Sequence, residues 1–161
     1  MAWWGKLIGG TLGFMMGGPL GALLGSSIGH QFDSGRGRAG GFDAGGQERT
    51  QAAFFTATFS VMGHLAKADG QVSEHEIQAA RSLMHQMRLN KAQREAAIDL
   101  FEKGKEPDFP LDAVLHQFRS ECHRRTTLLR MFLEIQVQAA WADGRIDPAE
   151  NRILAHVGEV L

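Results

Sequence analysis

The chain has very little cysteine, which excludes two common ways of stabilising a small protein. Among its 161 residues there is one cysteine, Cys122, so an internal disulfide or a zinc site built on Cys-x-x-Cys pairs cannot form. Such sparing use of cysteine is typical of a reducing compartment. The surrounding residues Ser120 to Arg124 are typical of a helix and contain no glycine-rich elbow. We therefore expect a partly buried thiol that packs on a helix rather than a nucleophile.

An excess of charge of one sign is also missing. The chain has 17 Lys and Arg residues against 18 Asp and Glu residues, which gives a formal net charge of -1. A protein that neutralises the phosphates of DNA or RNA needs a broad basic field, and an acidic interaction tail needs a run of carboxylates. Neither is present, so the sequence predicts no nucleic-acid partner.

The residue groupings that carry catalysis are absent from the sequence. No glycine-rich phosphate loop is followed by lysine, no His-Glu-x-x-His pattern occurs, and no nucleophile, base and oxyanion set can be assembled. Most of the histidines are scattered along the chain, at His64, His75, His85, His116, His123 and His156. We expect no enzymatic activity, no catalytic residues and no cofactor, apart from a divalent cation considered below.

A long uncharged stretch occupies the first part of the chain. From Leu7 to Ile28 no residue carries a charge, and a helix of about 22 residues spans the hydrocarbon of a bilayer. The Trp3-Trp4 pair and Lys6 precede the stretch, and Arg36 and Arg38 follow it, as expected of residues at a membrane interface. A cleaved signal peptide has a shorter apolar run, and a flexible leader is polar. The excess of basic residues after the span places the carboxyl-terminal part in the cytoplasm.

Glycine recurs at every fourth position through this stretch. The series is Gly5, Gly9, Gly13, Gly17, Gly21, Gly25 and Gly29. This spacing places the glycines on one helix face, where a second backbone can approach closely, so we expect the span to self-associate through them. Larger apolar side chains such as Leu20 are then expected to face lipid, and Pro19 to kink the helix. Residues 1–32 are predicted to be a glycine-zipper transmembrane anchor.

A glycine-rich linker and an all-α domain are predicted to follow the anchor. Residues 33–46 have glycines among charges and no apolar periodicity, as is typical of a linker. In residues 47–161 the apolar spacing predicts six helices, which run through Phe55–Leu65, through Ile77–Met87 with an end at Asn90, and over Ala92–Lys103, Leu111–Phe118, Leu128–Ala142 and Pro148–Leu161. The third is expected to stop at Gly104. No stretch alternates with the period of two that a strand requires, and about 115 residues can bury one core.

One internal repeat lies in the predicted helical domain. The nonapeptide from Ala68 to Glu76 matches the one from Ala142 to Glu150, and each follows one predicted helix and starts the next. The sequence therefore predicts a pair of similar helix–loop–helix corners.

Metal binding is one interpretation of these corners. Asp-Gly followed by an aliphatic residue and a later Glu corresponds to the second half of an EF-hand loop. The candidate ligands are Asp69, Glu76, Asp143, Asp147 and Glu150. Leu65, Lys67, Ala139 and Trp141 stand where the earlier oxygen ligands of such a loop would be needed. Too few carboxylates remain for a tight calcium cage, so only a weak divalent-ion site is predicted.

Helix capping is the other interpretation, and the one we favour. Gly70 and Gly144 can take the left-handed conformation that ends a helix. Ser73 with Glu76 fits a capping box, and Asp147 before Pro148 fits an N-cap.

The chain has one local cluster of basic residues. Its members are Arg119, His123, Arg124, Arg125 and Arg130. Helical spacing places Arg119 and His123 on one face. This face is either simply solvated or directed toward the anionic headgroups of a nearby membrane, and solvation is the expected account.

Three blocks of residues resemble a known family. They are Trp4-Gly5-Lys6-Leu7-Ile8-Gly9 with Ile28-Gly29-His30-Gln31-Phe32-Asp33, the block from Phe54-Phe55 to Val61-Met62-Gly63-His64-Leu65, and Arg130-Met131-Phe132-Leu133-Glu134-Ile135-Gln136. In these blocks the chain resembles the DjlA family of membrane-anchored, DnaJ-like co-chaperones of Gram-negative bacteria. Its globular part is similar to TerB-like helical domains, whose hallmark is the repeated Asp-Gly turn. The resemblance implies a single-pass protein of the bacterial inner membrane with a periplasmic amino terminus, a cytoplasmic helical domain, and a dimer formed through the span.

The activity that the resemblance implies resides in a carboxyl-terminal J domain, whose His-Pro-Asp tripeptide stimulates ATP hydrolysis by DnaK, an Hsp70 chaperone. None of the four prolines follows a histidine. We therefore expect this chain to be the anchor and regulatory portion of such a co-chaperone. The resemblance also implies a link to envelope-stress signalling through the Rcs phosphorelay and to capsule synthesis. The alternative is a stand-alone, membrane-tethered TerB-like interaction module with a weak divalent-metal site.

Overall fold

The computed structural model describes residues 18–23, 46–68, 70, 72–141, 144 and 147–161. Within these residues the chain is helical and contains no strand, which agrees with the predicted all-α class. The long helices are α3 (Gly46–Ala66), α4 (Glu74–Gln86), α5 (Lys91–Gly104), α6 (Leu111–Glu121), α7 (Thr126–Ala140) and α8 (Pro148–Val160). A short helical segment occupies residues 18–23.

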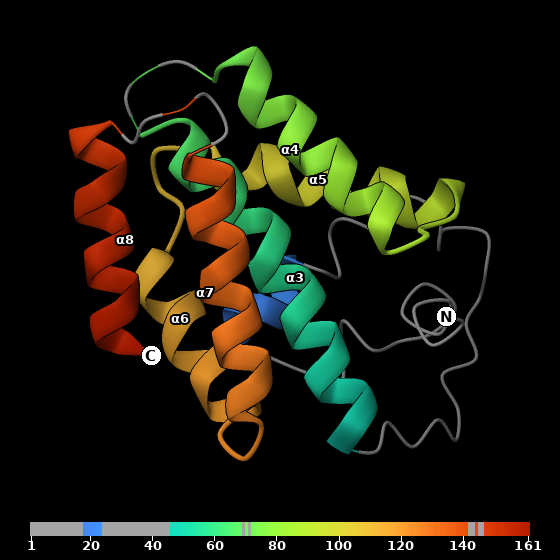
Figure 1. Ribbon diagram of the computed structural model, residues 1–161. Coiled ribbons are helices and arrows are strands. Elements are labelled where there is room, and N and C mark those ends of the chain that lie inside the picture. Colours follow the sequence, from blue (N-terminus) through green and yellow to red (C-terminus); the bar gives the residue numbers. More distant parts are fainter. Residues whose placement is uncertain (1–17, 24–45, 69, 71, 142–143, 145–146) are drawn as a thin grey trace.

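Helix α3 is the centre of the domain, and α5, α6 and α7 pack around it (Figure 1). Every residue from Thr50 to Gly63 is buried, because α3 carries apolar or small side chains on all of its faces. Phenylalanines fill much of the core, with the Phe55 and Phe59 rings 5.4 Å apart and the Phe118 and Phe132 rings 4.6 Å apart.

The end of the second predicted helix requires a correction. Helix α4 ends at Gln86, and Arg88 then takes a left-handed conformation with φ of 57°. Asn90 was expected to end this helix, but it is instead the N-cap of α5. Its Oδ1 accepts a hydrogen bond from the Gln93 backbone N–H at 2.8 Å, and Gln93 Oε1 accepts one from the Asn90 N–H at 2.8 Å. Asparagine fits either end of a helix, and here the reciprocal bond with Gln93 decides its place.

The last residues of the fifth predicted helix also differ from the expectation. Helix α7 ends at Ala140, with Trp141 as its C-cap, whereas the apolar run had suggested an extension to residue 142. The turn begins earlier because the Gly144 N–H donates to the Trp141 carbonyl at 2.8 Å. Helix α5 ends at Gly104, as predicted.

Residues 18–23, from the middle of the predicted anchor, pack against α6. The Leu20 backbone N–H donates to Gln117 Oε1 at 2.7 Å, and the Leu20 side chain is fully buried in the main hydrophobic core. This position differs from the expected one, in which Leu20 faces lipid. Gly18 begins the segment with φ of +66°. Among the described residues, no helix combines the length and the apolar character needed to cross a membrane.

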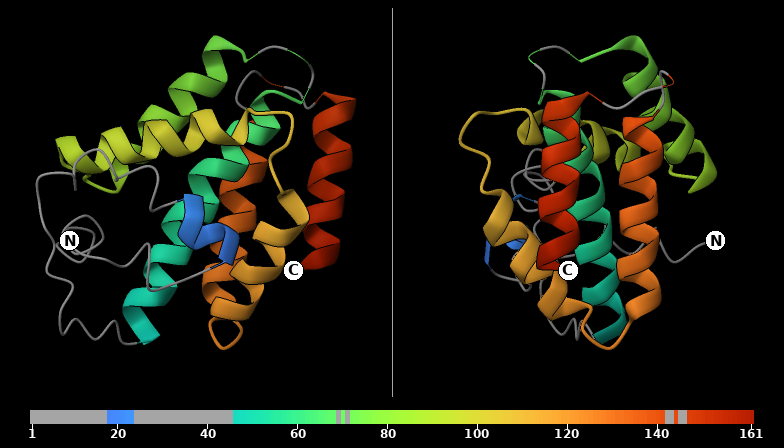
Figure 2. Two further views of the ribbon diagram at one scale, coloured as in Figure 1. Left: turned by 180° about the vertical axis from the view of Figure 1, so that it is seen from behind. Right: turned by 60° about the vertical axis from the view of Figure 1, so that its left-hand side comes forward.

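The two ends of the bundle have different characters. The start of α3 and the turn between α6 and α7 lie at one end, as the views in Figures 1 and 2 agree. The Thr50 hydroxyl links them by donating to the Glu121 carbonyl at 3.3 Å. The last turns of α3 and α7 and the first turns of α4 and α8 lie together at the opposite end.

Candidate functional site

The glycines of the two repeated corners share one backbone conformation. Gly70 and Gly144 both have φ of +95°, a conformation that favours glycine. The Gly70 N–H donates to the Lys67 carbonyl at 2.8 Å, just as the Gly144 N–H donates to the Trp141 carbonyl. A side chain added at either glycine would meet nothing within 4 Å, so these glycines are needed for backbone conformation rather than for space.

The capping interpretation of the corners agrees with the hydrogen bonds. At the first corner, the Glu76 N–H donates to Ser73 Oγ at 3.1 Å, and the Ser73 N–H donates to Glu76 Oε1 at 2.9 Å. At the second corner, Asp147 Oδ1 accepts from the Ala149 N–H at 2.8 Å, and Pro148 is the first residue of α8. These bonds satisfy backbone donors that the first turn of each helix leaves open.

The candidate metal ligands are only partly within the described structure. Asp69 and Asp143 lie outside the described residues. The carboxylates of Glu76 and Asp147 are used in capping, and Glu150 is buried with 3% of its surface exposed. Within the described ranges, no group of three or more His, Cys, Asp or Glu side chains could hold a metal ion. The divalent-ion site stays a prediction.

The glycine series of the anchor lies mostly outside the described residues. Gly5, Gly9, Gly13, Gly17, Gly25 and Gly29 are not described. Gly21 is buried within the segment 18–23. The predicted linker is likewise outside the described ranges, apart from Gly46 at the start of α3.

Cys122 is held in an unreactive state. Its side chain is fully buried at the end of α6, and burial raises the pKa of the thiol to about 12, with the charge of Glu121 adding to the effect. Only the thiolate is an effective nucleophile, so this environment opposes chemistry at the sulfur. The thiol is packed, as expected, but it is fully rather than partly buried.

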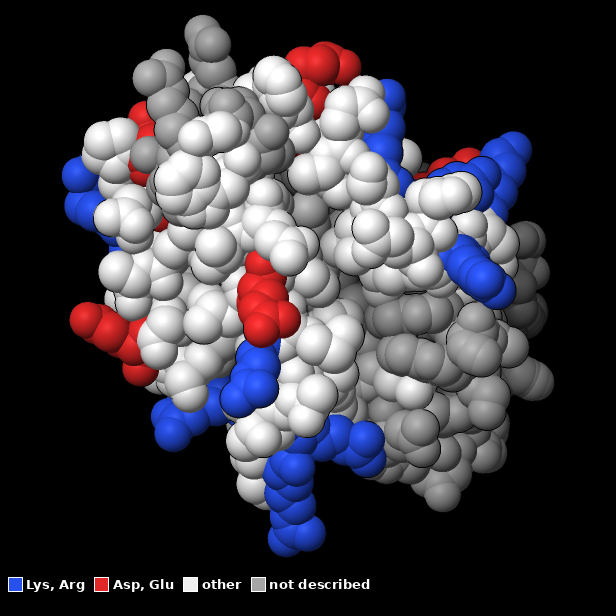
Figure 3. Space-filling model, viewed as in Figure 1, with Lys and Arg blue, Asp and Glu red and all other residues white. Residues whose placement is uncertain are grey.

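The basic cluster surrounds the turn between α6 and α7. All five of its side chains, from Arg119 to Arg130, are exposed. Figure 3 shows Lys and Arg side chains projecting from the lower part of this face, whereas much of the surface above is uncharged. The cluster thus lies at the end of the bundle where the chain enters α3.

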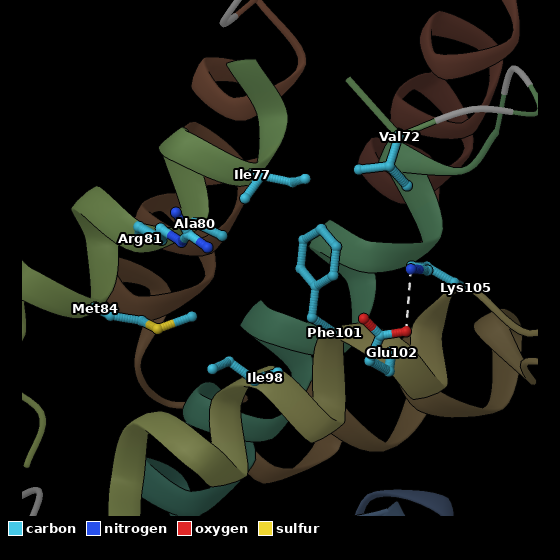
Figure 4. A pocket seen from close by; sticks show the side chains of 9 residues that line it. All are labelled: Val72, Ile77, Ala80, Arg81, Met84, Ile98, Phe101, Glu102 and Lys105. Carbon is cyan, nitrogen blue, oxygen red and sulfur yellow. Dashed lines mark ion pairs between the residues drawn. The ribbon is translucent and has the colours of Figure 1, made fainter. Parts of the chain in front are cut away.

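A groove between α4 and α5 is the feature that the sequence reasoning missed. Two adjoining cavities, of about 250 Å³ and about 510 Å³, lie between the helices and share Arg81, Met84 and Ile98. The first is lined mainly by apolar side chains, with Phe101 at its centre (Figure 4). The apolar spacing of each helix was recognised, but sequence spacing alone gives no sign that the two helices diverge. We call this feature the α4–α5 groove.

Two protein families match separate parts of the chain. Residues 1–39 match the family described as Co-chaperone DjlA transmembrane domain. Residues 55–161 match the family described as Tellurite resistance protein TerB. No solved structure matches the chain.

Curated relatives match along the full length of the chain. The co-chaperone protein DjlA of Escherichia coli (strain K12) is 48% identical over 162 residues, covering 100% of this chain and 59% of the relative. The DjlA protein of Yersinia pestis is 49% identical over 163 residues, covering 100% and 58%, and that of Salmonella typhimurium is 47% identical over 162 residues, covering 100% and 60%. The chain thus spans about three fifths of the length of these relatives.

Proposed function

The chain belongs to the TerB family, and from this premise we propose that it is the membrane anchor and regulatory portion of a DjlA-type co-chaperone. In this proposal the partner is an Hsp70 chaperone of the DnaK type. The stimulation of ATP hydrolysis resides in a J domain within the part of the relatives that this chain does not span.

The observation that carries this proposal is the sequence identity of 48% to the Escherichia coli DjlA protein along 100% of the chain. The alignment includes the stretch that matches the DjlA transmembrane family as well as the helical domain. A stand-alone TerB-like module with an unrelated tether would not be expected to align with DjlA through the anchor as well. The stand-alone interaction module is therefore the less favoured alternative.

The same proposal places the protein in the bacterial inner membrane, with the amino terminus in the periplasm and the helical domain in the cytoplasm. Residues 1–32 form the span, and the glycine series supplies the contact between two copies. Two arginines, Arg36 and Arg38, follow the span, whereas Lys6 precedes it, and this excess of basic residues on the carboxyl-terminal side supports the orientation. The link to Rcs signalling and capsule synthesis stays an expectation of the resemblance.

The positions of two features support a defined orientation of the domain on the membrane. The chain enters the domain at Gly46, and the basic turn between α6 and α7 lies at the same end of the bundle. A basic patch near the anchor gains electrostatic attraction to anionic headgroups. We therefore propose that this end faces the cytoplasmic leaflet and that the repeated corners point away from it.

The intact mass of the native gene product in the membrane fraction tests the proposal. We expect a mass clearly above 17.6 kDa, the mass of this chain, because a J domain must be present. The purified native product should stimulate ATP hydrolysis by DnaK, and the present chain alone should not. A native mass of 17.6 kDa would overturn the co-chaperone role and leave the stand-alone module.

A further inference from the structure

The floor of the α4–α5 groove is apolar and open to solvent. Ile77 and Met84 of α4 and Ile98 and Phe101 of α5 point into the same space, and Val72 closes one side (Figure 4). Ile98 has 49% of its surface exposed, the second-largest exposure among the large apolar side chains in the described ranges. An exposed isoleucine beside an apolar cavity offers surface that a ligand can bury favourably.

Helix α4 contributes little of its own surface to the core, which keeps the groove open. Of its 13 residues, only Glu76, Ala80 and Met84 are buried. Its first turn carries the capping box, and just beyond its last turn the Leu89 N–H donates to the Met84 carbonyl at 3.2 Å. The groove lies between two helices that diverge from the turn joining them (Figures 1 and 2).

The rim of the groove is basic at one end. Arg81, Arg88 and Arg94 line the larger cavity, and none of its described lining residues is a carboxylate. Arg94 Nη1 donates to the Leu89 carbonyl at 2.9 Å, which fixes its guanidinium group. Arg81 and Arg88 make no ion pair with any described residue.

The other end of the rim is electrically balanced. Glu102 lines the smaller cavity, and its carboxylate pairs with Lys105 Nζ at 3.0 Å. The unbalanced positive charge is therefore concentrated beside Arg81 and Arg88. A ligand that matches the whole groove must carry apolar groups along its length and carboxylates at one end.

We propose that the α4–α5 groove binds an amphipathic, acidic helix of a protein partner. Its apolar side chains would cover Ile98 and Phe101, and its carboxylates would face Arg81 and Arg88. An amphipathic helix suits a groove between two helices, because side chains at every third or fourth position project along one face. This proposal does not depend on the co-chaperone role.

The shape and the position of the groove favour a peptide over a lipid bilayer. A bilayer surface engages convex or flat basic patches, whereas the apolar side chains here line a hollow. The groove also lies toward the end of the bundle opposite to the entry at Gly46 and to the basic turn (Figures 1 and 2). The proposed membrane-facing end is therefore distant from it.

A peptide selection tests this proposal on the full chain in phosphatidylcholine nanodiscs. Random peptides displayed on phage are selected on the wild-type protein, after depletion on the variant Ile98→Glu. We expect enriched peptides with apolar residues at helical spacing flanked by Asp or Glu. The affinity of an enriched, fluorescently labelled peptide should fall at least about tenfold for Ile98→Glu and for Arg81→Glu, as at interface hot spots.

Two exposed positions on α7 supply matched controls. Met131 has 42% of its surface exposed, and Arg130 is exposed beside it, so Met131→Glu and Arg130→Glu introduce the same chemical changes outside the groove. We expect both controls to keep the wild-type affinity within about twofold. Unchanged circular dichroism spectra would show that all four variants fold.

Several outcomes would overturn the proposal. If the selected peptides shared no consensus, or a consensus without acidic residues, the groove would not bind an acidic helix. Equal weakening by the control variants would place the binding elsewhere. Binding of phosphatidylglycerol vesicles that is abolished by Ile98→Glu would assign the groove to lipid, and self-association of the protein that is abolished by the same change would assign it to a second copy.

Discussion

Gly63 of α3 and Gly104 of α5 face each other's helix in a reciprocal contact. A Cβ atom on Gly63 would lie 2.0 Å from the carbonyl oxygen of Phe101, and one on Gly104 would lie 1.8 Å from the carbonyl oxygen of Ser60. Each glycine thus approaches the carbonyl that lies three residues before the other glycine. The two backbones are closer than any side chain allows, which fixes how α5 lies on α3.

Alanine at Gly63 or Gly104 should destabilise the domain strongly. Each change forces the two helices apart, and overpacking of this kind costs at least about 2 kcal/mol. Gly158→Ala is the matched control, because this exposed glycine of α8 has nothing within 4 Å of a Cβ atom and alanine should stabilise its helix by up to about 1 kcal/mol. Urea unfolding in mild detergent, followed by circular dichroism, measures both. Equal stabilities of Gly63→Ala and Gly158→Ala would contradict the close contact.

The capping box at the first corner should contribute to stability with or without metal. Ser73→Ala removes the acceptor for the Glu76 N–H and should cost about 1 kcal/mol. The same unfolding measurement is made in calcium and in chelator, with Gln78→Ala on the exposed face of α4 as a control that should change little. A loss seen only in calcium would favour the metal interpretation instead.

The stability of the domain should fall as the pH is lowered through the titration range of His64. Burial lowers the pKa of His64 below the ordinary histidine value of 6.5, and its hydrogen bond with the Gly104 carbonyl opposes this only in part. The unfolded chain therefore takes up the proton first, so the stabilisation is complete above about pH 6.5 and is lost as the pH falls toward the lower folded pKa. His64→Gln should flatten this part of the profile, measured by urea unfolding between about pH 8 and pH 5. An unchanged slope in the variant would show that another group is responsible.

Cys122 should resist alkylation in the folded protein. With a pKa of about 12 and a buried side chain, the thiol provides almost no accessible thiolate at neutral pH. Iodoacetamide labelling followed by mass spectrometry should be slow in native buffer and rapid in urea. Fast labelling of the native protein would mean that the end of α6 opens readily.

The glycine series should control self-association of the anchor without controlling its insertion. Replacement of Gly13, Gly17 and Gly21 by Leu removes the close approach between two spans and adds apolar surface. A two-hybrid reporter in the bacterial membrane should show weaker association, and fractionation should show unchanged insertion. Gly10→Leu, which lies outside the four-residue series, serves as the control. Unchanged association in the triple variant would reject the zipper.

Local signals in the sequence predicted the helices well, because their causes are local. Apolar spacing located α4 to α8 within a few residues, and the Asp-Gly repeat located both corners and their caps. The start of α3 was missed, because α3 begins at Gly46, well before Phe55, the first apolar residue that marked the predicted helix. Asn90 was assigned to the wrong helix because an asparagine can either end or start one. The left-handed Arg88, which actually follows α4, has no sequence signal.

Features that depend on two distant segments could not be predicted in the same way. Gly63 looked like any glycine inside a helix, and its need for space arises only where α5 crosses it. Gln136 lies on the apolar face of α7, where its Nε2 donates to the Thr58 carbonyl at 3.1 Å across the core. The α4–α5 groove likewise arises from the angle between two helices, which tertiary packing decides.

Because Leu20 is buried in the core of the domain, insertion of its segment into a membrane is coupled to the stability of the domain. If a bilayer takes up residues 18–23, Leu20 must leave the core and Gln117 must give up its hydrogen bond to the Leu20 backbone. Removing one leucine from the core costs about 2 kcal/mol, and insertion has to supply that free energy. By linkage, a substitution that weakens the packing of Leu20 in the core favours insertion of residues 18–23 into the bilayer. Conversely, a bilayer that holds this segment lowers the free energy of unfolding of the domain. Lipid and protein therefore compete for the same leucine.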